Sequence, residues 1–164
     1  MYTPEGMLQL LSARSIAFKL YHHPPVGCGD CAHLFPKVDG VILKNLVLTT
    51  KKKRPLVLFT LPLNATANLK AVADALNLPR FSFARHSDLC FIGVPPGMVS
   101  PLALLNDVGC ELIYAVPEEL LSLPLVNCHP LRNNMSIDIK LSDLHRLVQE
   151  SGHQIHVLKG CLNA

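Results

Sequence analysis

A run of apolar and β-branched residues around a basic turn dominates the middle of the chain and predicts a β-hairpin. Its strands are expected at Val41–Thr50 and Pro55–Leu61, joined by the charged tip Lys51–Arg54. Both alternating sets of side chains in the first strand are apolar, so this strand is expected to be covered on both faces. Lys44 and Asn45 interrupt the apolar run. An unpaired buried ammonium is costly, so Lys44 must reach solvent, pair with a carboxylate or serve a function.

The rest of the chain predicts helices and short strands in alternation. Thr3 is the expected N-cap of the first helix, with Pro4 at its first position, and Ser142 the expected N-cap of the last. Because neighbouring strands are often too close for parallel crossovers, the sheet should be largely antiparallel or mixed. Helices are expected at Pro4–Ala13, Asn68–Leu76 and Ser142–Glu150, strands at Ile16–Tyr21, Phe81–Phe83, Glu111–Val116, Met135–Ile139 and Gln154–Leu158, and helical turns at Asp30–Leu34, Ser87–Phe91 and Glu118–Leu121.

The segment Gly93–Pro101 is predicted to be a rigid, irregular loop. It holds three prolines and two glycines in nine residues, a composition that excludes a regular element. Taken alone, such a loop is most often only a stiff connection between elements.

Composition bounds the class of protein. A chain of 164 residues with 49% hydrophobic and 16% charged residues is expected to form one compact domain over residues 1–164. Its apolar runs are too short to span a membrane and its start lacks a signal-peptide pattern, so we expect a cytoplasmic protein with no membrane partner. The six cysteines are then expected to be mostly reduced thiols. A net charge of +3 permits an anionic partner without identifying one.

Three short motifs follow one another along the chain. They are Lys44-Asn45-Leu46, then Gly97-x-x-x-Pro101 followed by Leu105-Asn106-Asp107, then Cys128-His129-Pro130-Leu131 with Asn133. In this order they resemble the prolyl-tRNA editing family, which includes free-standing deacylases and the editing domain inserted in some bacterial prolyl-tRNA synthetases. The resemblance runs from about Pro4 to Leu158. It implies an α+β fold with a largely antiparallel or mixed, partly barrel-like central sheet surrounded by helices.

The resemblance also implies an activity. The family hydrolyses the ester that joins a wrongly attached amino acid to the 3′ end of tRNA. This second, hydrolytic selection step is needed because a synthetase pocket discriminates against a smaller amino acid by only about 10–200-fold per methylene. The implied substrate is a small amino acid on proline tRNA, with alanine first. The implied partners are the tRNA acceptor end and, in addition, prolyl-tRNA synthetase. The resemblance implies neither a metal nor an organic cofactor.

Matched to the family motifs, Lys44 and Gly97 are the expected catalytic residues. Lys44 would lie at the scissile ester or the terminal phosphate, since an ammonium offers three donors to an oxyanion or a phosphate. The loop carbonyls would accept from the substrate's ammonium and its amides would help to hold the oxyanion. The expected substrate-binding residues are Asn45, Met98, Val99, Ser100, Pro101 and His129.

The nucleophile is expected to be a bound water. The chain has no Gly-x-Ser-x-Gly elbow, and Ser100 has no obvious histidine and acid partners in the sequence. We therefore expect the backbone and the substrate's own ribose hydroxyl to orient the water, with catalysis coming chiefly from positioning and electrostatics.

Lys51, Lys52, Lys53 and Arg54 place four cations at the predicted hairpin tip. A solvated turn that protects a sheet edge has this composition. A site for the phosphates of the tRNA acceptor arm has it too, and predicts salt-sensitive binding. Four basic residues also fit a nuclear import signal, though weakly.

Two departures from the family pattern leave other functions open. Leu43 stands where relatives often have a small polar residue, and Gly27–Cys31 replaces a helix that borders the pocket. Cys28-x-x-Cys31, near His22, His23 and His33, is a weak candidate for a metal or redox site. The remaining alternative is a non-catalytic relative that binds the tRNA end without turnover.

Overall fold

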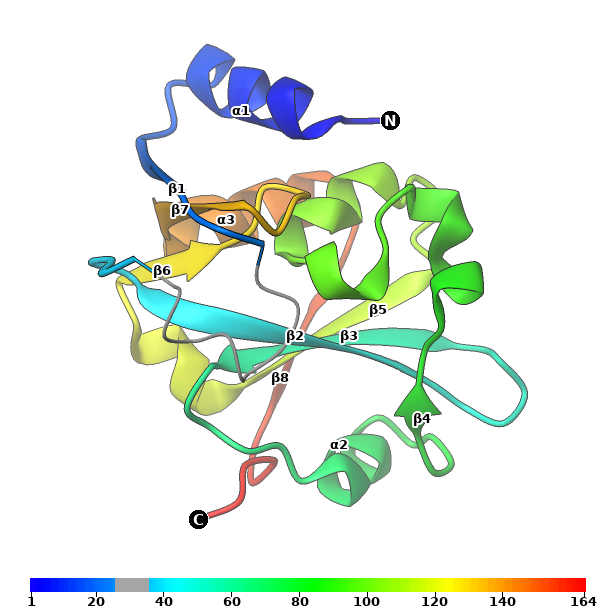
Figure 1. Ribbon diagram of the computed structural model, residues 1–164. Helices are drawn as coiled ribbons and strands as arrows, with labels where there is room; N and C mark the ends of the chain where they lie inside the picture. Colours follow the sequence, from blue (N-terminus) through cyan, green and yellow to red (C-terminus); the bar gives the residue numbers. More distant parts are fainter. Residues whose placement is uncertain (26–35) are drawn as a thin grey trace.

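A computed structural model describes residues 1–25 and 36–164 as a mixed sheet with helices on both of its faces (Figure 1). The strands are β1 Phe18–His22, β2 Val41–Thr49, β3 Leu56–Pro62, β4 Ser82–Phe83, β5 Leu112–Pro117, β6 Leu125–Cys128, β7 Met135–Lys140 and β8 Ile155–Leu158. The α-helices are α1 Pro4–Ala13, α2 Leu69–Ala75 and α3 Leu141–Glu150, and the 3₁₀ turns are η2 His86–Ile92, η3 Pro96–Met98, η4 Pro101–Asn106 and η5 Glu118–Ser122.

The predicted hairpin is the centre of the sheet. The strands follow the order β1-β7-β6-β2-β3-β5-β8, with β4 paired to the end of β2. The pairs β1–β7, β6–β7, β2–β3 and β2–β4 are antiparallel, whereas β2–β6, β3–β5 and β5–β8 are parallel. The expected mixed sheet is confirmed. Each parallel pair joins strands that are far apart in the chain, as the long crossover between parallel strands requires.

Strand β2 is covered on both faces, as its pattern predicts. Val47 belongs to the larger apolar cluster, which packs against α1, α3 and η4, and it is 4% exposed. The next residue, Leu48, belongs to a second cluster with α2 and is fully buried. Because successive side chains of a strand point to opposite faces, the two clusters lie on the two sides of the sheet. Figure 1 shows α1 and α3 on one side and α2 on the other.

Of the two predicted helix N-caps, one is confirmed and the other is wrong. Thr3 caps α1 as predicted, its hydroxyl accepting from the Gly6 amide at 3.0 Å. The cap predicted at Ser142 is wrong. Helix α3 begins at Leu141 directly after β7, so Lys140 is the N-cap and Ser142 already lies in the first turn.

The loop Gly93–Pro101 contains one regular turn, so the prediction that excluded any regular element there is wrong. A single 3₁₀ turn, η3, needs few backbone hydrogen bonds and tolerates proline at its start. Strand β6, which no pattern in the sequence indicated, follows η5 closely. The helical turn predicted at Asp30–Leu34 lies outside the described residues. Within residues 1–25 and 36–164, no helix has the length and apolar character that a membrane crossing needs.

Candidate active site

One edge of β2 is only partly paired. Strand β3 occupies the first edge along most of its length. On the second edge β6 pairs with Val41 and Ile42, and β4 pairs with Leu48 and Thr49. Between them, no strand of the described part of the chain pairs with residues 43–46 on this edge. The motif residues Lys44 and Asn45 therefore lie at an interruption of the sheet, which we call the open edge.

Lys44 is half-buried and its ammonium has no partner among the described residues, neither a hydrogen bond nor an ion pair. Its position is set by the parallel register of β2 and β6, which pairs Ile42 with Asn127. Continued by two residues, this register places Lys44 opposite His129. An ammonium without a carboxylate partner among the described residues is suited to bind an anionic group or a developing oxyanion.

Asn45 is engaged differently from Lys44. The Thr60 hydroxyl donates to its side-chain oxygen at 2.7 Å, across the β2–β3 pair, and Thr60 is fully buried. Because neighbouring strand residues point to opposite faces, the Asn45 side chain lies on the other face of the sheet from that of Lys44. The structure does not bring these two side chains together.

The loop before η4 presents some of its residues and buries the others. Val99, Ser100 and Pro101 are buried, whereas Gly97 is exposed and Met98 half-buried. A Cβ added at Gly97 would meet no heavy atom within 4 Å. The Ser100 hydroxyl donates to the backbone carbonyl of His129 at 2.6 Å and accepts from the Leu102 amide at 3.2 Å. The loop is thereby joined to the end of β6.

The imidazole of His129 is held in one orientation. Its Nδ1 lies 3.0 Å from the Met135 carbonyl, which can only accept, so Nδ1 carries the proton. Burial lowers the pKa of His129, and the nearby ring of His23 lowers this pKa further. In the neutral ring Nε2 carries no proton and can accept a hydrogen bond from a substrate group.

His23 is a site residue that the sequence motifs did not reveal. It follows β1, is 9% exposed, and its ring centroid lies 6.0 Å from that of His129. Its amide donates to the Asn134 carbonyl at 3.1 Å, extending the β1–β7 pairing to this point. In the sequence His23 stood out only through its nearness to Cys28 and Cys31, which lie outside the described residues together with His33.

A buried carboxylate, Asp138, supports the β2–β6 pairing that precedes Lys44 and His129. Its oxygens accept from the Gly40 amide at 3.1 Å, the Asn127 side chain at 3.0 Å and the Tyr21 hydroxyl at 2.6 Å. At Gly40 a Cβ would approach the Val126 carbonyl to 2.7 Å. Glycine at this position therefore lets β2 start close against β6.

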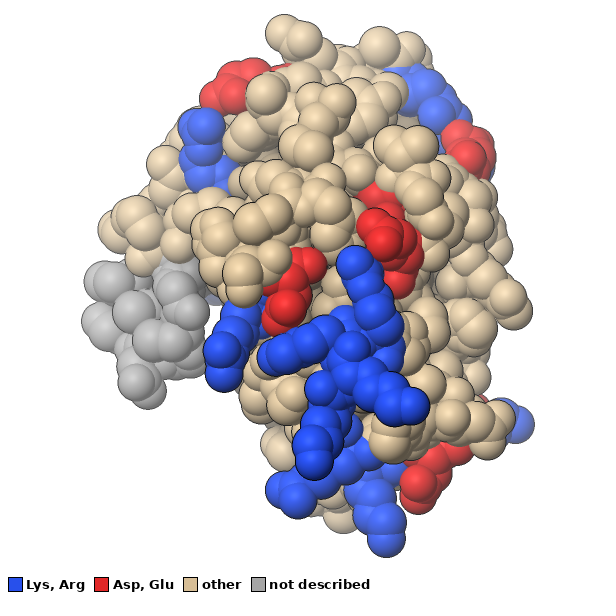
Figure 2. Space-filling model, turned by 90° about the vertical axis from the view of Figure 1, so that its right-hand side faces the viewer, with Lys and Arg blue, Asp and Glu red and all other residues tan. Residues whose placement is uncertain are grey.

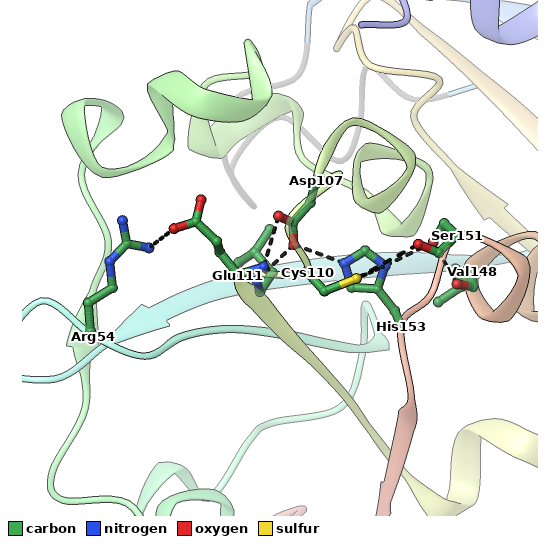
Figure 3. A network of polar contacts seen from close by, with 8 residues as sticks. Arg54, Asp107, Cys110, Glu111, Val148, Ser151 and His153 are labelled. Atoms are coloured by element: carbon green, nitrogen blue, oxygen red, sulfur yellow. Dashed lines mark hydrogen bonds and ion pairs between the residues drawn. The ribbon is translucent and has the colours of Figure 1, made fainter.

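Two further motif residues, Asn106 and Asp107, make structural contacts near the loop. The amide group of Asn106 donates to the Ile92 carbonyl at 3.2 Å, and its oxygen accepts from the Tyr2 amide at 2.6 Å. Figure 3 shows Asp107 bound to His153, whose Nε2 lies 2.8 Å from the carboxylate. Asp107 also accepts from the amides of Glu111 and Leu112. Both motif residues are buried and make structural contacts.

The basic tip lies at the far end of the hairpin. Lys51, Lys52, Lys53 and Arg54 are exposed. At a strand rise of about 3.3 Å per residue, the tip begins about 23 Å beyond Lys44. Arg54 forms an ion pair of 3.3 Å with Glu111, drawn in Figure 3, and its guanidinium lies 5.8 Å from the Phe91 ring. The tip is thus well separated along β2 from Lys44.

The cysteines of the described segments offer no evident nucleophile at the site. Cys128 ends β6 beside His129, but it is buried and burial raises the pKa of its thiol to about 12. In residues 1–25 and 36–164 no group of three or more histidine, cysteine or acidic side chains could hold a metal ion. The candidate site comprises the Lys44 ammonium, which has no partner among the described residues, the His129 imidazole, and the loop backbone at Gly97, which Ser100 joins to His129.

Comparison with known proteins connects the chain to one family. A family model described as the aminoacyl-tRNA editing domain matches residues 27–147. The prolyl-tRNA editing protein ProX of Acetoanaerobium sticklandii is 25% identical over 160 residues, which cover 94% of this chain and 96% of that protein. The prolyl-tRNA synthetase associated domain-containing protein 1 of Danio rerio is 29% identical over 151 residues, covering 88% of this chain and 80% of the relative.

Solved structures show the same fold. A crystal structure described as a candidate trans-editing enzyme for prolyl-tRNA synthetase superposes with a TM-score of 0.65 at 20% identity. The match covers 97% of this chain and 98% of that one. The architecture expected from the motifs is therefore confirmed over nearly the whole chain.

Proposed function

The chain belongs to the aminoacyl-tRNA editing domain family and is a deacylase, and from this premise we propose that it hydrolyses small amino acids wrongly attached to proline tRNA, alanine first. The relative named a prolyl-tRNA editing protein supports proline tRNA as the carrier. The work of such an enzyme is in the cytoplasm, where tRNA is charged, with prolyl-tRNA synthetase as the source of its substrate.

The observation that carries the proposal is the ammonium of Lys44 at the open edge, which has no partner among the described residues and follows the short β2–β6 pairing that His129 also follows. A lysine in the middle of an otherwise apolar strand, with no carboxylate partner among the described residues, is explained where a ligand supplies the missing negative charge. The ester carbonyl of aminoacyl-tRNA develops negative charge during hydrolysis, and the neighbouring phosphate is already charged. Either group would satisfy Lys44.

The reaction proceeds by addition of water to the ester carbonyl. The carbonyl oxygen becomes an oxyanion, which the Lys44 ammonium and the amides of the loop at Gly97 stabilise. The bond from the carbonyl carbon to the ribose oxygen then breaks, and the ribose oxygen takes up a proton. The neutral Nε2 of His129 accepts a hydrogen bond from the terminal adenosine and holds it beside Lys44. Positioning of this kind can supply much of the rate enhancement of an enzyme without a protein nucleophile.

The loop residues Gly97 and Met98 select the amino acid in this proposal. The open space in front of Gly97 gives the aminoacyl group room against the backbone, so loop carbonyls can accept from its ammonium. The buried residues Val99, Ser100 and Pro101 hold this backbone in place from behind. Asn45 supports the same strand through its bond to Thr60.

The test is hydrolysis of a panel of tRNA(Pro) molecules charged with glycine, alanine, serine, cysteine or proline. We expect rapid release of alanine and negligible release of proline, the amino acid that this tRNA carries correctly. If only another small amino acid is released, that amino acid is the substrate and alanine is not. Retention of all five amino acids by a protein that still binds the tRNA would replace the deacylase with a binding module.

A further inference from the structure

Five exposed cations gather on one face of the molecule, on two different elements. Lys51, Lys52 and Lys53 form the hairpin tip, and Arg80 and Arg85 flank β4, which pairs with β2 just before the tip. None of the five forms an ion pair with a described residue. Figure 2 shows Lys and Arg side chains gathered on this face, with acidic side chains at the border. We call these five residues the basic surface.

An exposed aromatic ring lies within the basic surface. Phe83 is 60% exposed, and Arg80 and Arg85 lie on either side of it along the chain. Phe83 belongs to neither of the two apolar clusters. A ring among cations is the arrangement by which proteins bind RNA strands, the ring stacking on a base while the cations contact phosphates.

The ring and the tip lie at defined distances from Lys44. Phe83 pairs with Leu48, four residues beyond Lys44 on β2, and the tip begins seven residues beyond it. At about 3.3 Å per strand residue these steps are about 13 Å and 23 Å. Stacked nucleotides advance by about 3.4 Å each, so the two distances correspond to about four and about seven nucleotides.

We propose that the acceptor strand of the tRNA runs alongside β2, from Lys44 at the open edge past Phe83 of β4 to the hairpin tip. This inference rests on the proposed function, which places the 3′ end of the strand at Lys44. Phe83 then stacks on the nucleotide about four positions from the 3′ end, and the tip contacts phosphates about seven positions away, in the paired stem. The contacts at the tip are independent of sequence, whereas the contact at Phe83 senses one base.

Two substrates of different length test this path. One is whole alanyl-tRNA(Pro), and the other is the alanyl ester of the trinucleotide CCA, which is too short to reach Phe83 or the tip. The variants are the triple replacement of Lys51, Lys52 and Lys53 by alanine, the pair Arg80→Ala and Arg85→Ala, and Phe83→Ala. The control is the pair Lys140→Ala and Lys159→Ala, exposed cations outside the basic surface.

We expect the triple variant to lower kcat/KM for whole tRNA by at least about tenfold at low salt and to reduce the slope of log K against log salt by about 2–3. The arginine pair should act in the same direction, and Phe83→Ala should lose about tenfold. None should change hydrolysis of the trinucleotide ester, and the control pair should change neither substrate.

Other outcomes separate the two proposals. Variants that cleave whole tRNA like the wild type, or that lose activity equally on both substrates, would overturn the path. If the wild type cleaves only whole tRNA, binding of uncharged tRNA and of CCA by the same variants gives the comparison, and unchanged tRNA affinity would overturn the path. If the wild type cleaves neither substrate, the proposed substrate is wrong, and the binding comparison decides the path independently. Loss of synthetase binding without loss of tRNA binding would assign the basic surface to a protein partner and contradict the path.

Discussion

The Ser100 hydroxyl donates a hydrogen bond of 2.6 Å to the backbone carbonyl of His129. This contact joins the loop that ends at Ser100 to the segment that follows β6, two motifs 29 residues apart. Because the serine proton is directed at a carbonyl, Ser100 acts as a link between the two motifs and is not placed as a nucleophile. The position of Gly97 relative to His129 depends on this link.

Replacement of Ser100 by alanine should loosen the loop. The free energy of unfolding should fall by about 1–2 kcal/mol, the usual effect of removing a partner from a buried hydrogen bond. Deacylation should fall by about tenfold or more, since small displacements of a positioning segment are costly in rate. Chemical denaturation and single-turnover hydrolysis measure the two effects. Ser122→Ala is the matched control, because its hydroxyl donates to the Glu119 carbonyl at an exposed turn. Equal losses in the two variants would contradict the link.

Two glycines should respond in opposite ways to alanine. At Gly97 the added methyl enters open space, so stability should be unchanged while deacylation of alanyl-tRNA falls, because the methyl occupies room proposed for the substrate. At Gly40 the methyl meets the Val126 carbonyl at 2.7 Å and the Asp138 carboxylate at 2.8 Å. That variant should lose about 1–3 kcal/mol of stability. Thermal unfolding and hydrolysis assays compare them, and a fully active Gly97→Ala would remove Gly97 from the site.

The pair of Asp107 and His153 should be among the most sensitive in the protein. Their side chains are 0% and 1% exposed, and the carboxylate also accepts two backbone amides (Figure 3). Asp107→Asn should therefore lower the free energy of unfolding by about 3–5 kcal/mol, as removal of one partner from a buried pair does. Glu150→Gln is the control, because its ion pair with Arg14 is exposed and should contribute less than about 1 kcal/mol. If Asp107→Asn and Glu150→Gln unfold at comparable urea concentrations, the buried pair does not have this stabilising role.

His145 should make the protein less stable in mild acid. Burial lowers its pKa to about 4, and its Nε2 lies 3.0 Å from the Tyr114 hydroxyl. The unfolded chain binds the proton near its ordinary pKa of about 6.5 while the folded chain does not, so stability falls as pH drops from about 6.5 to 4. The loss should be on the order of 2 kcal/mol. Urea unfolding of His145→Gln at the same pH values should show a smaller loss, and parallel curves would contradict the assignment.

The hairpin and the helices could be predicted because their signals are local. Thr3 before Pro4 marks a helix start, and the two apolar faces of β2 mark a strand covered on both sides. The N-cap predicted at Ser142 was wrong because serine favours a cap by its residue type alone. Helix α3 begins at Leu141, directly after β7 ends at Lys140. Strand β6 has four residues and little pattern, and its pairing with β2 and β7 defines it.

The site could be predicted only in part, for the same physical reason. Motif resemblance selected Lys44, Gly97 and His129, but it gave no information about which side chains face each other. The opposite orientation of Asn45 follows from strand geometry once β2 is paired with β3. His23 reaches His129 only through the pairing of β1 with β7, a contact between residues more than a hundred positions apart. Such contacts have no local signature.

The central claim is that the Lys44 ammonium acts on the aminoacyl ester, and Lys44→Met tests it most directly. Methionine keeps most of the side-chain volume and removes the charge, so the fold should persist. We expect single-turnover hydrolysis of alanyl-tRNA(Pro) to fall by about 10²–10³-fold, the usual effect of removing one group that stabilises an oxyanion. Lys70→Met, at the start of α2, should keep full activity. A folded Lys44→Met protein that hydrolyses alanyl-tRNA(Pro) at the wild-type rate would contradict the claim.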